Sequence, residues 1–138
     1  NKIGKVLIQT YYPNQPVIQS FKNRDRDSFI TQSLIERKKF NVPPFGFITA
    51  IIISASKKVI AEAYAFKFVN SIFSDSNIEV LGPVEAPLFL LRGKYRYRLL
   101  LKGNNRKKLN FFTKNIIKKC PPPSNIRITI DVDPYTFT

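Results

Sequence analysis

The stretch FITAIIISASKKVIAEAYAFKFVNSIF, residues 47–73, decides the fold because its apolar pattern changes halfway along. Residues 47–54 are mostly β-branched or aromatic and predict a buried strand. Apolar side chains then recur every three or four positions, which predicts a helix over 57–73 with Ser56 as its N-cap. A strand joined directly to a helix is the first half of a βαβ unit.

Three further strands and one further helix follow toward the C-terminus. The predicted elements are strands over 78–81, 95–102 and 126–132, with Gly82-Pro83 ending the first of them, and a helix that is capped by Asn104 or Asn105 and runs to Lys119. The order β-α-β-β-α-β is the split βαβ, or ferredoxin-like, arrangement. We therefore predict an α+β domain whose antiparallel sheet carries both helices on one face.

The residues before this domain form two smaller parts. Residues 5–12 are β-branched and aromatic and stop at Pro13, so they predict a strand. A helix is predicted from Asp27, its N-cap, to Phe40, and Pro43-Pro44 then enforces an extended chain. We predict three parts: a strand and turn in 1–24, a linking helix in 25–42, and the split βαβ domain in 43–138.

Composition excludes several classes of function. The chain has 138 residues, of which 43% are hydrophobic, so it can form one core. Histidine is absent and Cys120 is the single cysteine. A His-based triad, a His/Cys zinc site and an intramolecular disulfide are therefore excluded. No apolar run approaches the roughly 20 residues of a membrane span. We expect a cytoplasmic chain with no catalytic centre, metal or cofactor of its own.

Basic residues are concentrated in one block of the sequence. Lys and Arg number 23 against 9 Asp and Glu, which gives a formal net charge of +14. Residues 92–119 contain no acid and hold a large share of the cations: Arg92, Lys94, Arg96, Arg98, Lys102, Arg106, Lys107, Lys108, Lys114, Lys118 and Lys119. Such a block predicts an electropositive surface that attracts phosphate backbones or acidic peptides.

The segment Arg92-Gly93-Lys94-Tyr95-Arg96-Tyr97 resembles the third-strand motif of RNA-recognition modules, but its aromatic residues are displaced by one position. In that motif the aromatic rings lie on the open face of the sheet and stack on bases. A shift of one residue turns Tyr95 and Tyr97 toward the helices and the intervening cations outward. We predict that this outward face contacts DNA phosphates through Arg92, Lys94, Arg96, Arg98 and Lys102.

Two aspartates share one face of the last predicted strand. Asp131 and Asp133 have no histidine or third carboxylate close to them in the sequence, and no glycine-rich phosphate loop accompanies them. We therefore expect charge balance against the basic sheet, or turn formation at Asp133-Pro134, and not a metal site or an acid/base pair.

Several segments, in order, resemble the C-terminal part of the PriA family of bacterial replication-restart helicases (primosomal protein N-prime). The matching segments are Gly4-Lys5-Val6-Leu7-Ile8-Gln9-Thr10-Tyr11-Tyr12-Pro13, Pro16, Glu36-Arg37-Lys38, Pro43-Pro44-Phe45-Gly46, Leu81-Gly82-Pro83, Leu91 to Tyr97, Leu99-Leu100-Leu101-Lys102 and Ile130-Asp131-Val132-Asp133-Pro134. The resemblance implies the last strand of helicase lobe two followed by a C-terminal domain similar in fold to ribosomal protein S10.

The resemblance also implies a function for the parent protein. The family's enzymes are ATP-driven 3′-to-5′ DNA helicases that act at abandoned replication forks. Their ATP, Mg and Zn sites would lie upstream of Asn1. The C-terminal domain is expected to bind branched or single-stranded DNA. It is also expected to hold the acidic tail of single-stranded DNA-binding protein through Arg106 and Asn110.

Two hypotheses about the function of the chain therefore remain. One is a DNA-binding and partner-docking module of a helicase. The other is a free-standing S10-like or RNA-binding structural protein. If the first holds, the strand over 6–12 lacks its neighbouring strands, and we expect it to add to a sheet of a second copy or to pack on the helix over 27–40.

Overall fold

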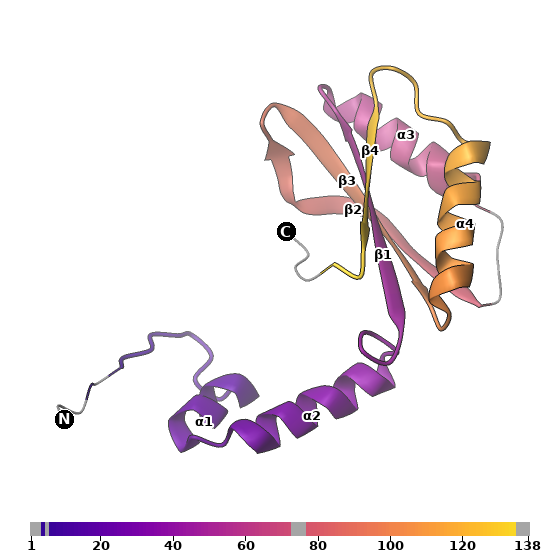
Figure 1. Cartoon of the computed structure of the whole chain (residues 1–138). Helices are drawn as coiled ribbons and strands as arrows, with labels where there is room; N and C mark the ends of the chain where they lie inside the picture. The colour runs from indigo at the N-terminus through magenta and orange to yellow at the C-terminus, as the bar shows by residue number, and fades with distance from the viewer. Residues whose placement is uncertain (1–3, 5, 73–76, 135–138) are drawn as a thin grey trace. The chain divides into compact units, whose positions relative to one another are not determined.

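A computed structural model describes residues 4, 6–72 and 77–134 (Figure 1). The chain divides into two compact units, Asn1–Glu36 and Arg37–Thr138, so the division falls inside helix α2 (Arg26–Lys39). The three-part division expected from the sequence stays a prediction. No helix in the described part is long and apolar enough to cross a membrane.

The strand predicted over 5–12 is wrong for the residues that the structure describes. Residues 6–12 form no strand, and the side chains of Val6 and Leu7 are 87% and 97% exposed. A strand is stable only when a neighbour satisfies its backbone groups, and the described residues of this unit offer none. Residues 6–12 are all exposed, so the expected packing of this segment on the helix over 27–40 is not observed either. Self-association of the chain stays a prediction.

Helices fill the rest of the first unit. Helix α1 (Pro16–Asn23) was not predicted, although a proline at the first helical position is favourable. The Asp25 carboxylate accepts a hydrogen bond from the Ser28 backbone N–H at 3.1 Å and caps α2. The predicted cap, Asp27, instead lies in the first turn of the helix, where a negative charge is also favourable.

The second unit is the predicted split βαβ fold. The strands are β1 (Phe47–Ala55), β2 (Ile78–Leu91), β3 (Lys94–Gly103) and β4 (Arg127–Val132). They form one antiparallel sheet in the order β2-β3-β1-β4. Helices α3 (Lys58–Asn70) and α4 (Arg106–Lys119) cover one face of this sheet (Figure 1). In the described part of this unit no helix covers the other face, which is called the open face below.

Strand β2 is longer than predicted because it continues through Gly82-Pro83. Its pairing with β3 shifts register after Leu81 and again after Glu85. Proline is tolerated here because β2 is an edge strand, and Gly82 adopts a φ of 104° that other residues rarely take. The sequence signal therefore marked a bulge within the strand and not its end.

The two helices of this unit begin differently. The Asn105 side chain accepts a hydrogen bond from the Lys108 backbone N–H at 3.0 Å, which confirms it as the cap of α4. The predicted cap of α3 is wrong, since Lys57 occupies that position and makes no side-chain cap bond. The Ser56 hydroxyl instead accepts a hydrogen bond from Lys94 Nζ at 2.6 Å.

The core lies between the helices and the sheet. Ile51, Leu99, Leu101, Phe68 and Leu109 are essentially fully buried in it. Tyr95 and Tyr97 belong to the same cluster, which confirms that the β3 tyrosines face the helices. The sheet can therefore offer no aromatic base-stacking platform from β3 on its open face.

A buried hydrogen bond joins the two helices. The Tyr64 hydroxyl of α3 donates to the Cys120 carbonyl, just after α4, at 2.7 Å. Burial, followed by this hydrogen bond, raises the pKa of Tyr64 well above its ordinary value. The two helices are thereby held against the same face of the sheet, which leaves the opposite face free.

Candidate nucleic-acid interface

Alternation along β3 places its cations on the open face of the sheet. Because Tyr95, Tyr97, Leu99 and Leu101 pack under the helices, the residues between them point the other way. The open-face residues of β3 are Lys94, Arg96, Arg98, Leu100 and Lys102. The open face therefore carries four of the five cations predicted to contact DNA.

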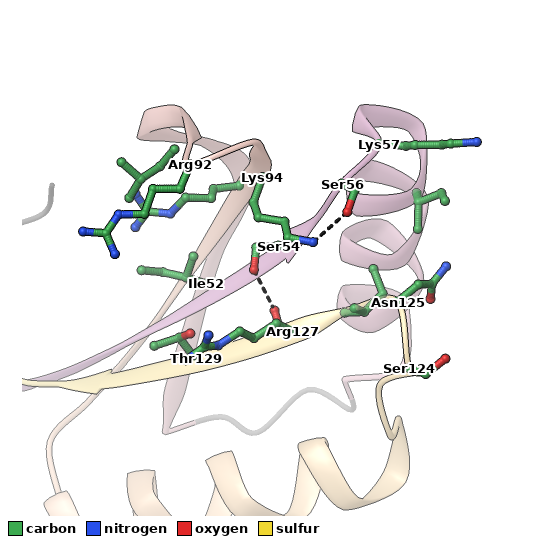
Figure 2. Close-up of a pocket in the computed structure, with 14 residues that line it drawn as sticks. Ile52, Ser54, Ser56, Lys57, Arg92, Lys94, Ser124, Asn125, Arg127 and Thr129 are labelled. Atoms are coloured by element: carbon green, nitrogen blue, oxygen red, sulfur yellow. Dashed lines mark hydrogen bonds between the residues drawn. The ribbon is translucent and has the colours of Figure 1, made fainter.

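A groove of about 720 Å³ lies at one end of this open face, where β1 ends and β3 and β4 begin (Figure 2). Five cations line the groove: Lys57, Arg92, Lys94, Arg96 and Arg127. No acidic side chain of the described residues is among those that line it. The groove is therefore a site of uncompensated positive charge.

Strand pairing builds the groove. Ser54 of β1 lies opposite Arg96 of β3 on one side and Arg127 of β4 on the other. Adjacent strands lie about 4.8 Å apart, so the two arginines start about 10 Å apart across the groove. The Ser54 hydroxyl donates to the Arg127 carbonyl at 3.3 Å and fixes β4 beside β1 (Figure 2).

The β2–β3 turn and the first residue of β3 supply two further cations, Arg92 and Lys94. Arg92 and Gly93 have φ values of 50° and 72°, as in the tight hairpin turns that suit twisted strands. Figure 2 shows the Arg92 side chain extending from this turn and Lys94 reaching across to Ser56. Lys57 points away from both. The turn thus places two cations beside the pair formed by Arg96 and Arg127.

Neutral side chains complete the groove. Hydroxyl and amide groups of Ser124, Asn125 and Thr129 lie along it and can donate hydrogen bonds to phosphate oxygens. Its apolar lining consists of Ile52, Ile60, Leu91 and Ile126. No aromatic residue is among the described residues of the lining, so the chemistry of the groove favours phosphate contacts over base stacking.

The predicted site residues do not all meet in this groove. Arg92, Lys94 and Arg96 line it, whereas Arg98 lies one row further along the open face. Lys102 lies toward the opposite end of the face and forms an ion pair with Glu79 at 2.7 Å, with its side chain only 17% exposed. The role of these five residues in DNA binding stays a prediction.

Sequence reasoning missed two cations of the groove. Lys57 and Arg127 lie far from the acid-free block in the sequence, and only strand pairing brings them to it. A signal for Arg127 was present, because it alternates with Ile126 and Ile128, which belong to or pack on the core. The same alternation that was applied to β3 would have placed Arg127 outward.

The second predicted site lies at the other end of β1. The Arg106 guanidinium forms an ion pair with the Asp133 carboxylate and lies 5.1 Å from the centre of the Phe47 ring. The other Asp133 oxygen accepts a hydrogen bond from the Ile48 backbone N–H at 3.1 Å. Asn110, one turn further along α4, is half-buried.

This ion pair has a local physical reason. Arg106 is the first residue of α4, where the helix dipole disfavours a cation. The Asp133 carboxylate compensates both the guanidinium and the dipole. Asp133 therefore balances a cation of helix α4 and not, as expected, the cations of the sheet. Within the described residues, no three His, Cys, Asp or Glu side chains are grouped closely enough to hold a metal ion.

Comparison with known proteins assigns the family. The family model of the primosomal protein N C-terminal domain matches residues 38–135, which begin within one residue of the second compact unit. The chain belongs to this family. The match covers the groove and the Arg106 site together, and it confirms the resemblance found in the sequence.

Curated relatives of this primosomal protein N C-terminal domain agree with the assignment. The chain is 36% identical to the replication restart protein PriA of Rickettsia typhi, 32% to that of Synechocystis and 27% to that of Bacillus subtilis, each over 97% of its length. It spans 20%, 16% and 17% of those proteins, which is about a fifth. The chain thus contains a domain of a replication restart protein, and a free-standing S10-like protein is not favoured.

Proposed function

We propose that this domain binds the phosphate backbone of DNA through the basic groove. The observation that carries the proposal is that four cations from the β2–β3 turn, β3 and β4 line one groove without an acidic neighbour among the described residues: Arg92, Lys94, Arg96 and Arg127. Cations that replace condensed counterions on DNA give binding that ignores sequence and weakens with salt. The described lining of the groove has no aromatic residue on which a base could stack, and its cations suit phosphate contacts, which carry no sequence information.

The parent protein would supply the rest of the activity. We infer an ATP-dependent 3′-to-5′ DNA helicase that acts in replication-fork restart, with ATP, Mg and Zn bound by other segments of that protein. In this arrangement the present domain holds branched or single-stranded DNA and performs no chemical step. Action on chromosomal DNA would place the protein in the cytoplasm.

Removal of the two opposed arginines tests the groove. The double variant Arg96→Ala/Arg127→Ala is expected to reduce the slope of log affinity against log salt by about 1.8 for duplex or about 1.4 for single-stranded DNA, because each lost phosphate contact removes about 0.9 or 0.7. The slope is measured by fluorescence anisotropy with labelled fork, duplex and single-stranded oligonucleotides. The salt concentration is varied from about 50 to about 200 mM, where the affinity changes steeply.

A control variant separates the groove from net charge. Lys22→Ala/Lys67→Ala removes the same total charge from exposed lysines outside the groove. This variant should keep the slope of the unaltered chain. An unchanged slope in the arginine variant, or an equal loss in both variants, would show that the groove does not bind DNA.

We propose partner docking at Arg106 as a second function. Here the supporting observation is that the guanidinium already holds a carboxylate, that of Asp133, beside an aromatic ring. Guanidinium and carboxylate groups match in geometry and form strong, directional hydrogen bonds. The expected ligand is the acidic tail of single-stranded DNA-binding protein, with Asn110 as a neighbouring contact.

Exchange of the internal carboxylate tests this docking site. Asp133→Asn keeps an oxygen for the Ile48 N–H but removes the charge that competes for Arg106, so affinity for an acidic tail peptide should rise about twofold to fivefold. Arg106→Ala should abolish binding, and Asp131→Asn, two residues away, should leave it unchanged. Isothermal titration calorimetry measures all three. An unaltered affinity in the Arg106 variant would refute the site.

A further inference from the structure

A second basic surface lies on the outer side of α4. Phe111 is 68% exposed, although Leu109, two residues before it on the same helix, is buried in the core. Lys107, Lys114 and Lys118 lie four residues before it and three and seven residues after it. Residues at these spacings share one face of a helix. The exposed ring therefore lies in one row with three lysines along the helix.

The helix presents this surface away from the sheet. Its buried residues are Leu109, Thr113 and Ile116, and the row through Phe111 lies on the opposite side of the helix. Helix α4 covers one face of the sheet (Figure 1). Arg96 of the groove lies on the other face, so the outer side of α4 and the open-face part of the groove lie on opposite layers of the domain. A ligand in the groove would leave the α4 surface accessible.

The charge of this surface is not neutralised by the helix. Residues 104–119 contain no acid. All three lysines are exposed, and none forms an ion pair with the described part of the chain. Lys114 and Lys118 are one turn apart, a like-charge spacing that destabilises an isolated helix. A bound polyanion would relieve this repulsion.

We propose that the outer face of α4 is a second nucleic-acid contact, at which an unpaired base stacks on Phe111 while Lys107, Lys114 and Lys118 hold the flanking phosphates. Sites for single strands combine cations along the backbone with exposed rings on which bases stack. The residues one helical turn before and after this ring are all lysine or asparagine, so α4 presents the ring as a flat stacking partner among polar side chains: Lys107, Lys108, Lys114 and Asn115.

The two surfaces therefore differ in the part of the nucleic acid that they fit. The described lining of the groove contains no aromatic residue and suits backbone contacts, whereas the α4 surface carries a ring and suits a base. One domain could then hold two arms of a branched DNA, with a paired arm in the groove and an unpaired arm on α4. This inference does not depend on the groove, because it concerns separate residues.

A single tryptophan reports on the α4 surface. The chain contains no Trp, so Phe111→Trp in the 138-residue protein introduces one fluorophore at the proposed stacking position. Titration with a single-stranded oligonucleotide should quench its emission, because stacking brings a base against the indole. Phe66→Trp, at a half-exposed position on α3, is the matched control and should not be quenched.

Further variants and ligands test whether the quenching comes from base stacking, from charge alone or from binding of a different kind of partner. Phe111→Ala should weaken single-strand binding at least about fivefold, the lower end for loss of one stacked base. Equal quenching by an abasic oligonucleotide, or quenching by a poly-glutamate peptide and not by DNA, would overturn the proposal. In the Arg96→Ala/Arg127→Ala background, quenching should persist; its loss would show that α4 is no separate site.

Discussion

Replacement of Lys94, Arg96 and Arg127 by glutamate is expected to lower the affinity for duplex DNA at least about 500-fold at 0.1 M salt. A phosphate contact with a slope of 0.9 contributes about eightfold at this salt concentration, and three contacts multiply. All three side chains line one groove, and two of them lie on opposite sides of Ser54. Introduced carboxylates would also repel the backbone, so the loss exceeds that of neutral variants.

A matched charge reversal gives the control. Lys22, Lys38 and Lys67 are exposed and lie outside the groove, so their replacement by glutamate changes the net charge equally. Affinity measured by anisotropy should fall far less in this control, and circular dichroism should show that both variants are folded. Similar losses in the two variants would mean that binding depends on total charge and not on the groove.

The groove contains Arg127, which was not predicted, and lacks Arg98, which was predicted to contact DNA. This difference shows which part of the site the sequence could predict. The alternation of tyrosines and cations in β3 predicted the two faces of this strand, because a period of two fixes the direction of every side chain. It could not predict which strands flank β1. That pairing brings Arg127 into the groove, whereas Lys102 is neutralised by Glu79 on the neighbouring edge strand.

Errors in the predicted elements also have physical causes. The strand over 5–12 was inferred from β-branched and aromatic residues that stop at Pro13, but a strand needs a partner that local sequence cannot specify. The prediction that β2 ends at Gly82-Pro83 failed because an edge strand tolerates proline. Of the two asparagines predicted as the cap of α4, Asn105 takes that position, since an asparagine side chain satisfies helix N–H groups locally.

The acid-free block of residues 92–119 is continuous in the sequence, but its cations lie on two separate surfaces of the structure. Its strand portion faces outward from the sheet, and its helix portion faces outward from the opposite layer. Between the two, Lys102 and Arg106 are taken up by Glu79 and Asp133. One continuous charged segment thus provides two separate basic surfaces with neutralised residues between them.

Removal of the largest fully buried ring is expected to have the largest effect on stability. Phe68 of α3 lies in the core, with its ring centre 6.1 Å from that of Tyr64, and it is fully buried. Phe68→Ala should lower the free energy of unfolding by about 3 to 5 kcal/mol, because lost burial adds to the cost of a cavity. Urea denaturation followed by circular dichroism measures this change.

A residue two positions earlier on α3 provides the comparison. Phe66 is 49% exposed, so Phe66→Ala should change the unfolding free energy by no more than about 0.5 kcal/mol. The sequence could not distinguish these two phenylalanines by hydrophobicity, because α3 is apolar on several sides. Only the register against Leu99 and Leu101 of β3 decides which ring is covered. Equal losses in the two variants would mean that α3 packs on the sheet in a different rotation.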